Sequence, residues 1–257
     1  METLPDLLLE ALSSKVVFAP DGTTRPLESN VSREEAEALY TAVRSIQPVC
    51  SLEIGLAQGI SALAILAAIS ANGPSGHHYV VDPFQKNYAN CGEAMITLGG
   101  FADRHTFLER FPEEVVPQLQ RLQFAFIDAS HLFDFTMMEF VLVDKKLEVG
   151  GLIALYDLWM PSLQTVLRFI HTNRGVSDSP RLFGPSSNSY LAAAIHRVCQ
   201  PRPQKTSRNQ AAAEPRAPGS LVRISAEQPG VPGKGSGRFP VTGDFIGNSE
   251  PKEPKHS

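Results

Sequence analysis

Short apolar segments alternate with helix-like segments through the middle of the chain, and each apolar segment leads into a glycine loop or an acidic residue. Four of them span residues 49–54, 78–81, 124–127 and 152–156. Apolar runs of this length predict strands buried on both faces, and their alternation with helices predicts a parallel α/β sheet. Because right-handed crossovers place the carboxyl ends of parallel strands along one edge, we expect the residues that follow these strands to line one crevice.

The other elements give weaker signals in the sequence. Further strands are expected at 106–109 and 191–198, and the capping-box pattern of Ser32 and Glu35 predicts a helix that ends before Pro48. Helices between the strands are predicted over 60–70, 87–98, 113–122, 132–147 and 162–171.

Composition divides the chain into three parts. Residues 1–47 predict a helical segment that packs on the core, and residues 48–199 carry the alternating strands and helices. Residues 200–257 contain nine of the chain's 20 prolines, with Gly, Ser and Lys between them, which predicts a disordered tail.

Charge and cysteine content limit the partners and the compartment. The net charge is −4, so the chain lacks the basic excess of a nucleic-acid-binding protein. Its cysteines, Cys50, Cys91 and Cys199, form no CxxC pair. No apolar run reaches the ~18 residues of a membrane span, and the N-terminus lacks the basic region of a signal peptide. We therefore expect a cytoplasmic protein that binds neither nucleic acid nor a membrane.

The loop after the first strand contains Glu53, Gly55 and Gly59. Glycine lets a backbone approach a ligand closely, and the start of the next helix provides amide groups and a positive dipole end. Dinucleotide-binding loops have Gly-x-Gly-x-x-Gly, whereas this loop has Gly-x-x-x-Gly. An acid at position 53 repels a pyrophosphate and suits the ammonium group of an amino acid. The alternative is an ordinary tight turn between strand and helix.

Asp82 ends the second strand, 23 residues after Gly59. A carboxylate at this place can accept hydrogen bonds from both ribose hydroxyls of a nucleoside. The alternative is that Asp82 caps the turn that begins at Pro83.

Four pieces of sequence make the chain resemble the class I S-adenosylmethionine-dependent methyltransferases. It is most similar to the group that includes macrocin-type and rhamnosyl O-methyltransferases. The resemblance implies a Rossmann-like, doubly wound, mostly parallel sheet of seven strands whose last strand is antiparallel. It covers about residues 30–198, and the matching pieces are 52–55 with Gly59, 80–83, 126–131 and 147–157.

The resemblance also implies the cofactor, S-adenosyl-L-methionine. The family often has Gly-Asp-Ser near the adenine, but this chain has residues 109–112 there, and Phe111 is the candidate to pack on the adenine ring. The expected cofactor-binding residues are Glu53, Gly55 and Gly59 at the methionine end, Asp82 at the ribose, and Asp128.

The fourth strand ends at Asp128, and His131 follows at the start of a predicted helix. A helix N-terminus favours neutral imidazole, the form that a general base needs near pH 7. His131 and Asp128 are therefore the candidate catalytic residues for removing the proton of a substrate hydroxyl. The alternative is a structural histidine that bonds to Asp128 or Asp134.

Asp157 ends the fifth strand, so Asp128 and Asp157 are also candidate ligands of a divalent cation such as Mg²⁺. A metal would polarise the acceptor oxygen and lower its pKa. Metal-dependent O-methyltransferases usually add a third Asp, Asn or Glu beside the last Asp, but the neighbours here are a tyrosine and a leucine. Whether the site binds a metal therefore stays open at this point, and His131 or Asp134 is the candidate for an additional ligand.

The sequence favours a methyltransferase (EC 2.1.1) that methylates a hydroxyl of a small molecule, a sugar or a phenol. Trp159, just after the fifth strand, is expected to line the acceptor side. Two alternatives stay open, an NAD-binding Rossmann oxidoreductase and a non-catalytic methyltransferase-like binding protein. The acceptor's identity and a homo-oligomeric state are undetermined by the sequence.

Overall fold

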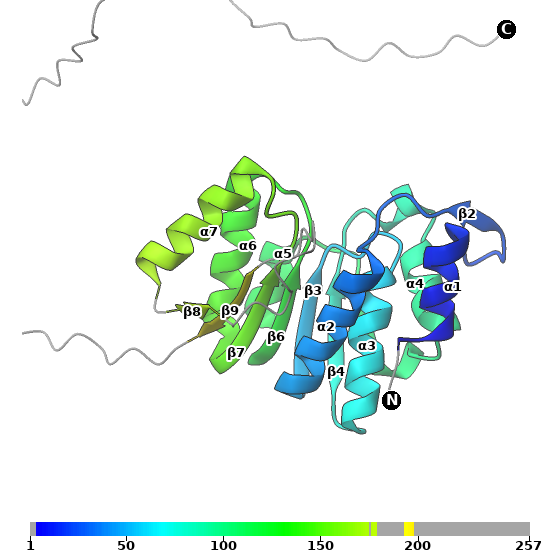
Figure 1. Ribbon diagram of the computed structural model, residues 1–257, viewed down its shortest axis with the longest axis horizontal. Helices are drawn as coiled ribbons and strands as arrows, with labels where there is room; N and C mark the ends of the chain where they lie inside the picture. The colour runs from blue at the N-terminus through cyan, green and yellow to red at the C-terminus, as the bar shows by residue number, and fades with distance from the viewer. Residues whose placement is uncertain (1–3, 175, 179–192, 198–257) are drawn as a thin grey trace, which may run out of the picture. The chain divides into compact units, whose positions relative to one another are not determined.

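The computed structural model describes residues 4–174, 176–178 and 193–197 (Figure 1). All of these residues belong to one unit of the chain, residues 1–204. The tail expected over 200–257 lies outside the described residues.

The central sheet is built on five strands that pair in parallel. In spatial order these are β5 (His105–Leu108), β4 (His77–Val81), β3 (Cys50–Ile54), β6 (Leu122–Ile127) and β7 (Leu147–Leu155). Beyond β7, β9 (Ala193–Arg197) pairs antiparallel with β7, and β8 (Val176–Asp178) pairs antiparallel with β9. The expected Rossmann-like sheet is present. Its five central strands pair in parallel, and β9, the last strand among the described residues, runs antiparallel to both of its neighbours.

The parallel strands end at one level. Ile54 of β3 lies beside Val81 of β4 and Ile127 of β6, and Ile127 lies beside Leu155 of β7. The pairing continues one residue further, because Asp128 N donates to Ile54 O over 2.9 Å. The residues that follow the strands therefore meet at one edge of the sheet, and they are Gly55, Asp82, Asp128 and Tyr156.

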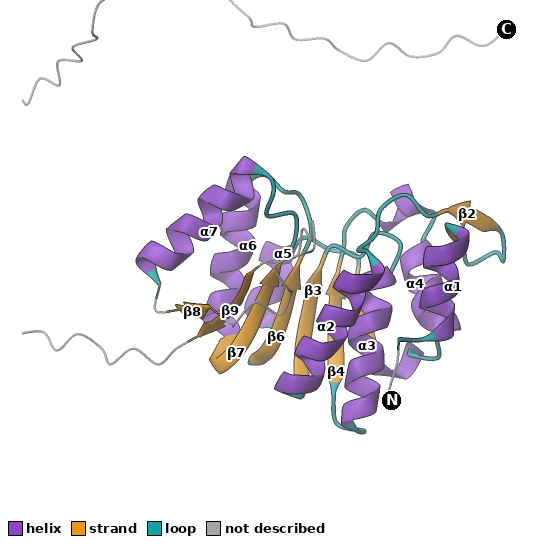
Figure 2. Ribbon diagram, in the orientation of Figure 1, coloured by secondary structure: helices purple, strands orange, loops and turns teal. Residues whose placement is uncertain are grey.

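Alternate residues of the central strands face two helical layers (Figure 2). Phe124 and Phe126 pack with α1 (Asp6–Ser14), α2 (Arg33–Ile46) and α3 (Ile60–Asn72). Ala125 and Ile127 face the other way, toward α6 (Phe133–Lys146) and α7 (Pro161–Asn173). The period of two in a strand thus separates two apolar cores, as a doubly wound sheet requires. No helix in the described ranges is long and apolar enough to cross a membrane.

Two predicted helices are shorter than the sequence suggested. The helix expected over 87–98 divides into η1 (Gln85–Tyr88) and α4 (Cys91–Leu98), because two linking residues adopt left-handed backbone, with φ of 51° and 54°. The helix expected over 113–122 is α5 (Pro112–Val115) followed by the turn η3 (Val116–Gln118). Pro117 has no N–H to continue the helix, and Leu122 already belongs to β6.

The N-terminal segment carries a small two-stranded sheet that the sequence analysis did not predict. β1 (Val16–Phe18) pairs antiparallel with β2 (Thr24–Pro26), which lies in the polar stretch before α2. The predicted capping box of α2 is confirmed. Ser32 N donates to Glu35 Oε2 over 2.7 Å, and Glu35 N donates to Ser32 Oγ over 3.2 Å.

Gly55 lies where the ends of β3 and β6 approach most closely. Its φ is +93°, and a Cβ built on it would lie 2.0 Å from the carbonyl oxygen of Asp128. Gly59 has a φ of +83°, and its Cβ would lie 2.8 Å from the carbonyl oxygen of Gly92 in α4. Both glycines therefore let backbone segments of this chain pack against one another, a role that the sequence analysis did not assign to them.

Replacing Gly55 with alanine is expected to lower the free energy of unfolding by about 3 kcal/mol, since the added methyl group must displace backbone and the residue must keep a positive φ. Denaturant unfolding of the two proteins measures this change. Gly22→Ala is the matched control, because Gly22 has a φ of +80° but no atom within 4 Å of its Cβ position. Gly22→Ala should lower the free energy of unfolding by only about 1 kcal/mol. Equal losses in both variants would contradict the packing role of Gly55.

Candidate functional site

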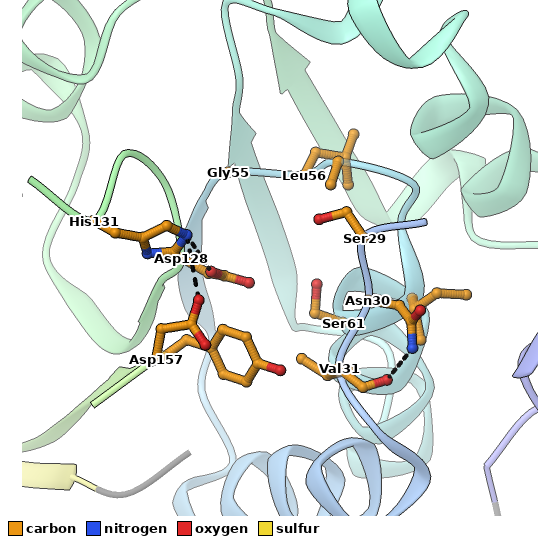
Figure 3. Close-up of a pocket in the computed structure, with 12 residues that line it drawn as sticks. Ser29, Asn30, Val31, Gly55, Leu56, Ser61, Asp128, His131 and Asp157 are labelled. Atoms are coloured by element: carbon orange, nitrogen blue, oxygen red, sulfur yellow. Dashed lines mark hydrogen bonds and ion pairs between the residues drawn. The ribbon is translucent and has the colours of Figure 1, made fainter. Parts of the chain in front are cut away.

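Two adjoining hollows open at the carboxyl edge of the sheet. The larger, which we call the edge cavity, has a volume of about 460 Å³, and the smaller, the side pocket, about 60 Å³. Figure 3 shows the side pocket, with residues of the sheet edge on one side and the 29–31 segment and Ser61 on the other. Both hollows are lined by Ser29, Gly55, Ala57, Asp128 and His131.

Asp82 holds the glycine loop in place. Its Oδ2 accepts hydrogen bonds from the backbone N–H groups of Leu56 (3.1 Å) and Ala57 (3.2 Å) and from Gln85 Nε2 (2.8 Å). Its Oδ1 accepts from Phe84 N over 2.7 Å, which is the turn cap considered as an alternative. Asp82 also lines the edge cavity, and Oδ1 keeps a lone pair for a ligand hydroxyl. Capping and ribose binding are therefore compatible at this residue.

Gln58 ties the N-terminal segment to the glycine loop. Its Nε2 donates to Pro26 O over 2.7 Å, and its Oε1 accepts from the backbone N–H groups of Glu28 (2.8 Å) and Ser29 (3.2 Å). The side chain is buried, so these bonds are shielded from water. They hold residues 29–31 against the side pocket as its outer wall.

Glu53 is fully buried behind the site and does not belong to the lining of either hollow. Its carboxyl accepts a short hydrogen bond from Ser61 Oγ and lies 3.2 Å from His78 Nε2. Burial raises the pKa of Glu53 to about 8, and burial lowers the pKa of His78 to about 3. Both groups are thus neutral at pH 7, so Glu53 acts on the site through Ser61, which lines the side pocket, and not as an exposed countercharge.

Tyr156 forms a wall of the side pocket that the sequence analysis missed. Its hydroxyl donates to Glu35 Oε2 over 3.2 Å, which links the end of β7 to the capping box of α2. Burial, followed by the nearby carboxylates of Glu35 and Asp128, raises the pKa of the tyrosine hydroxyl. Tyr156 therefore stays protonated and serves as a hydrogen-bond donor.

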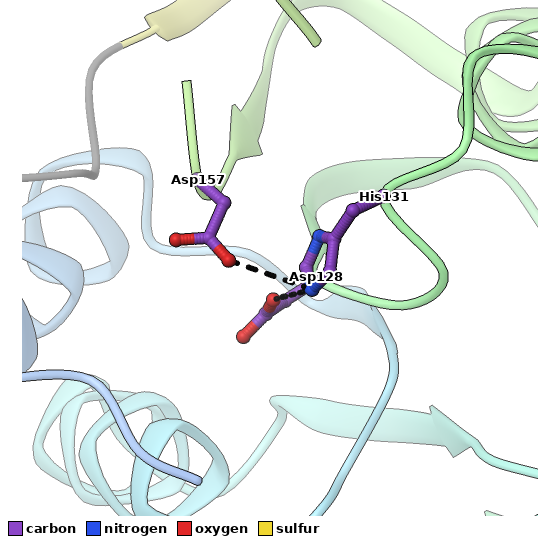
Figure 4. A group of neighbouring side chains, drawn as sticks. All are labelled: Asp128, His131 and Asp157. Atoms are coloured by element: carbon purple, nitrogen blue, oxygen red, sulfur yellow. Dashed lines mark ion pairs between the residues drawn. The ribbon is translucent and has the colours of Figure 1, made fainter. Parts of the chain in front are cut away.

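Asp128, His131 and Asp157 come together at the junction of the two hollows, and we call them the Asp/His cluster (Figure 4). His131 Nε2 lies 3.8 Å from Asp128 Oδ1 and 3.5 Å from Asp157 Oδ2. These distances are too long for good hydrogen bonds but close enough for ion pairing. All three side chains are partly exposed, so a ligand in the hollows can reach them.

Local backbone geometry orients the Asp/His cluster. His131 and Asp157 both adopt left-handed backbone, with φ of 56° and 55°, which is uncommon outside glycine. Ser162 Oγ donates to His131 O over 2.7 Å, and Trp159 Nε1 donates to Asp157 Oδ1 over 3.0 Å. Asp134, the alternative partner of His131, is exposed and is not part of the cluster.

The donor set of the cluster fits a divalent cation. One ligand atom from each of the three residues lies within 4.8 Å of the others. Burial, and after it the Asp157 carboxylate, raises the pKa of Asp128 well above its usual range. A cation between the groups would offset this repulsion. Two carboxylate oxygens and an imidazole nitrogen suit Mn²⁺ or Fe²⁺ better than Mg²⁺, which prefers oxygen ligands alone.

The structure brings together most of the predicted site residues. Gly55, Asp82 and Asp128 line the edge cavity, and Asp157 lines the side pocket. Phe111 also lines the edge cavity and packs edge-to-face with Phe84, with ring centroids 5.9 Å apart. The sequence analysis assigned no role to several further residues of the site, because their roles depend on contacts between segments distant in the chain; they are Ser29, Asn30, Val31, Gln58, Ser61, Gln85, Glu139 and Tyr156.

The chain is similar to known methyltransferases in sequence pattern and in fold. Residues 52–158 match the family model described as a methyltransferase domain. No curated protein matches the chain in sequence.

Solved structures of methyltransferases superpose on the chain at low sequence identity. A Podospora anserina methyltransferase bound to S-adenosylhomocysteine (SAH) has a TM-score of 0.60 at 16% identity, covering 76% of this chain and 89% of that one. A Bacillus cereus O-methyltransferase in complex with SAH has a TM-score of 0.55 at 18% identity, covering 65% of this chain and 83% of that one. TomG, an O-methyltransferase from Streptomyces achromogenes in complex with S-adenosylmethionine, has a TM-score of 0.56 at 17% identity, covering 75% of this chain and 90% of that one. These likenesses establish a Rossmann-like methyltransferase fold.

Asp82→Ala is expected to lower the free energy of unfolding by about 2–4 kcal/mol without any ligand, because buried amides of the glycine loop lose their acceptor. Denaturant unfolding of the ligand-free protein measures this. Asp103→Ala removes an exposed acid near β5 and should change stability by less than about 0.5 kcal/mol. If the ligand-free Asp82→Ala protein were as stable as the parent, Asp82 would not hold the glycine loop in place, and ribose binding would be its one remaining role.

Proposed function

We propose that this protein transfers a methyl group from S-adenosyl-L-methionine to a hydroxyl of a small-molecule acceptor, a sugar or a phenol. The observation that carries this proposal is the position of the Asp/His cluster where the side pocket meets the edge cavity. That position places groups that can handle a proton next to a hollow large enough for a nucleoside, in a chain with a methyltransferase-domain match.

The two hollows supply a separate surface for each part of the cofactor. The amino-acid end fits the side pocket, where Ser61 offers a hydroxyl and the 29–31 segment offers polar backbone. The ribose lies at Asp82, and the adenine extends into the edge cavity beside Phe111. The sulfonium methyl group then lies between the hollows, where it faces the Asp/His cluster.

His131 removes the proton of the acceptor hydroxyl, and Asp128 and Asp157 stabilise the imidazolium that forms. Methyl transfer is an in-line displacement, so the protein must hold the acceptor oxygen at near-attack distance from the methyl carbon. Exposed apolar side chains beside the cluster give the acceptor a surface to pack on; these are Leu132, Phe133 and Trp159.

The same cluster would hold a divalent cation through Asp128, His131 and Asp157. A bound cation would supply a Lewis acid that lowers the pKa of the acceptor hydroxyl. His131 is then a ligand and not the base, so the two roles are mutually exclusive and can be separated by experiment.

Calorimetry should detect binding of SAH to the full chain and no binding of NADH. The reason is that the Gly-x-x-x-Gly loop lacks the glycine spacing of dinucleotide-binding sites. Ser61→Ala should weaken SAH binding about fivefold or more, since one neutral hydrogen bond at the methionine end is lost. Ser70→Ala, at the far end of the same helix, is the control. Binding of NADH but not of SAH would refute the methyltransferase proposal.

Chelation and substitution of His131 together separate the base from the metal ligand. The readout is transfer of labelled methyl groups to a panel of sugars and phenols. His131→Ala should reduce kcat by about 10²-fold or more.

If His131 is the base, exhaustive EDTA treatment leaves the parent activity unchanged. If it is a ligand, EDTA abolishes activity and added Mn²⁺ restores it. His171→Ala, on the exposed face of α7, controls for loss of a histidine. Full activity of His131→Ala would remove His131 from both roles.

A further inference from the structure

Glu139 is a buried acid with one carboxyl oxygen that has no partner among the described residues. It lies in the middle of α6 and is only 3% exposed. Within the described part of the chain, its Oε2 atom has no hydrogen-bond partner. A buried carboxyl oxygen without a partner is costly, so such a group in a native structure indicates that a partner outside the described residues, such as a bound ligand, completes it.

Glu139 faces the edge cavity. Phe135, Met138 and Glu139 all line this cavity, and their spacing places them on one side of α6. Opposite them lie Phe111 and Pro112 at the start of α5. The walls around Glu139 are thus mostly apolar and aromatic, which suits a flat, heteroaromatic ligand group flanked by side chains.

The geometry points to Glu139 as the residue that binds the Watson–Crick edge of the cofactor's adenine, an inference that rests on the proposed function. Asp82 and Glu139 both line the edge cavity, and Phe111 lines it with them. A nucleoside that places its ribose hydroxyls on Asp82 and one face of its base on Phe111 directs the free edge of the base toward α6. Glu139 is the buried polar side chain that α6 presents to this cavity.

The chemistry of the two edges is complementary. Burial, and secondarily the Glu113 carboxylate, raises the pKa of Glu139 to about 7, so the neutral acid is well populated at neutral pH. A neutral carboxyl has one O–H donor and one carbonyl acceptor. Adenine offers an acceptor at N1 and a donor at the N6 amine, side by side. Glu139 therefore donates to N1 and accepts from N6, and the oxygen that has no partner among the described residues gains one.

The methyl acceptor is a less suitable occupant of this end of the cavity. Methyl transfer takes place at the Asp/His cluster, and His131 lies before the first turn of α6 whereas Glu139 lies two turns further along the helix. At 1.5 Å per residue, Glu139 lies about 9 Å along the helix axis from Phe133, the first residue of α6. Adenine is the part of S-adenosylmethionine most distant from the reacting methyl group, which matches this separation.

Calorimetry with altered cofactors tests the contact between Glu139 and N1. The ligands are SAH, its 1-deaza analogue, which lacks the N1 acceptor, and its 7-deaza analogue as the ligand control. The proteins are the parent, Glu139→Gln, Glu139→Leu and, as the protein control, Glu114→Gln. Glu114 is an exposed acid on α5, paired with Arg110 at 2.9 Å. Thermal unfolding of each variant confirms that it is folded.

The parent should bind 1-deaza-SAH about tenfold more weakly than SAH, because the Glu139 hydroxyl loses its acceptor. Glu139→Gln should keep this discrimination, since its amide also offers a donor beside an acceptor. Glu139→Leu should bind SAH about tenfold more weakly than the parent and discriminate less than about twofold between the two ligands. Glu114→Gln should behave as the parent, and 7-deaza-SAH should bind all four proteins in the same order as SAH.

Equal discrimination by the parent and Glu139→Leu would overturn the inference while leaving SAH binding, and so the proposed function, intact. Failure of the parent to bind SAH at all would instead overturn the proposed function. Weakened SAH binding in Glu139→Leu with unchanged discrimination would show that Glu139 only shapes the cavity, which also overturns the direct contact with adenine.

Discussion

The approach of Gly55 to the carbonyl oxygen of Asp128 is the contact on which the rest of the site depends. There is no room for a Cβ at Gly55, so β3 and β6 can end side by side only with glycine at this position. The glycine loop then reaches the carboxylate of Asp82, and Gln58 of the same loop reaches the N-terminal segment. Three segments far apart in the sequence are thereby held around the two hollows.

The acids at the sheet edge differ in what surrounds them, and this difference sets what each can do. Glu53 is buried against a neutral histidine and stays protonated at pH 7, so it supports the site from behind. Asp82 is engaged by loop amides. Asp128 and Asp157 both lie near the imidazole of His131, and the three side chains could together hold a cation.

Under the proposed function, one part of the two hollows binds the cofactor's base and another part carries the reaction. Their shared wall carries the Asp/His cluster, whereas the distant end of the edge cavity carries aromatic side chains and Glu139. Under the proposed function, recognition of the base far from the reacting atoms would let binding energy position the sulfonium without crowding the acceptor. The apolar side chains of Leu132, Phe133 and Trp159 are exposed, and under the proposed function they would offer the acceptor a surface.

The sequence by itself determined the parallel strands, the helical layers and the edge where their acids meet, because strand period and turn chemistry are local properties. It could not assign a role to Glu139 or Tyr156, since both acquire their roles from elements distant along the chain. It also predicted that Glu53 would face the ammonium group of the cofactor, and it could not show that burial raises the pKa of this carboxyl to about 8. Only tertiary structure decided these points, because burial, pKa and close backbone contacts depend on what lies across the fold and not on neighbouring residues in the chain.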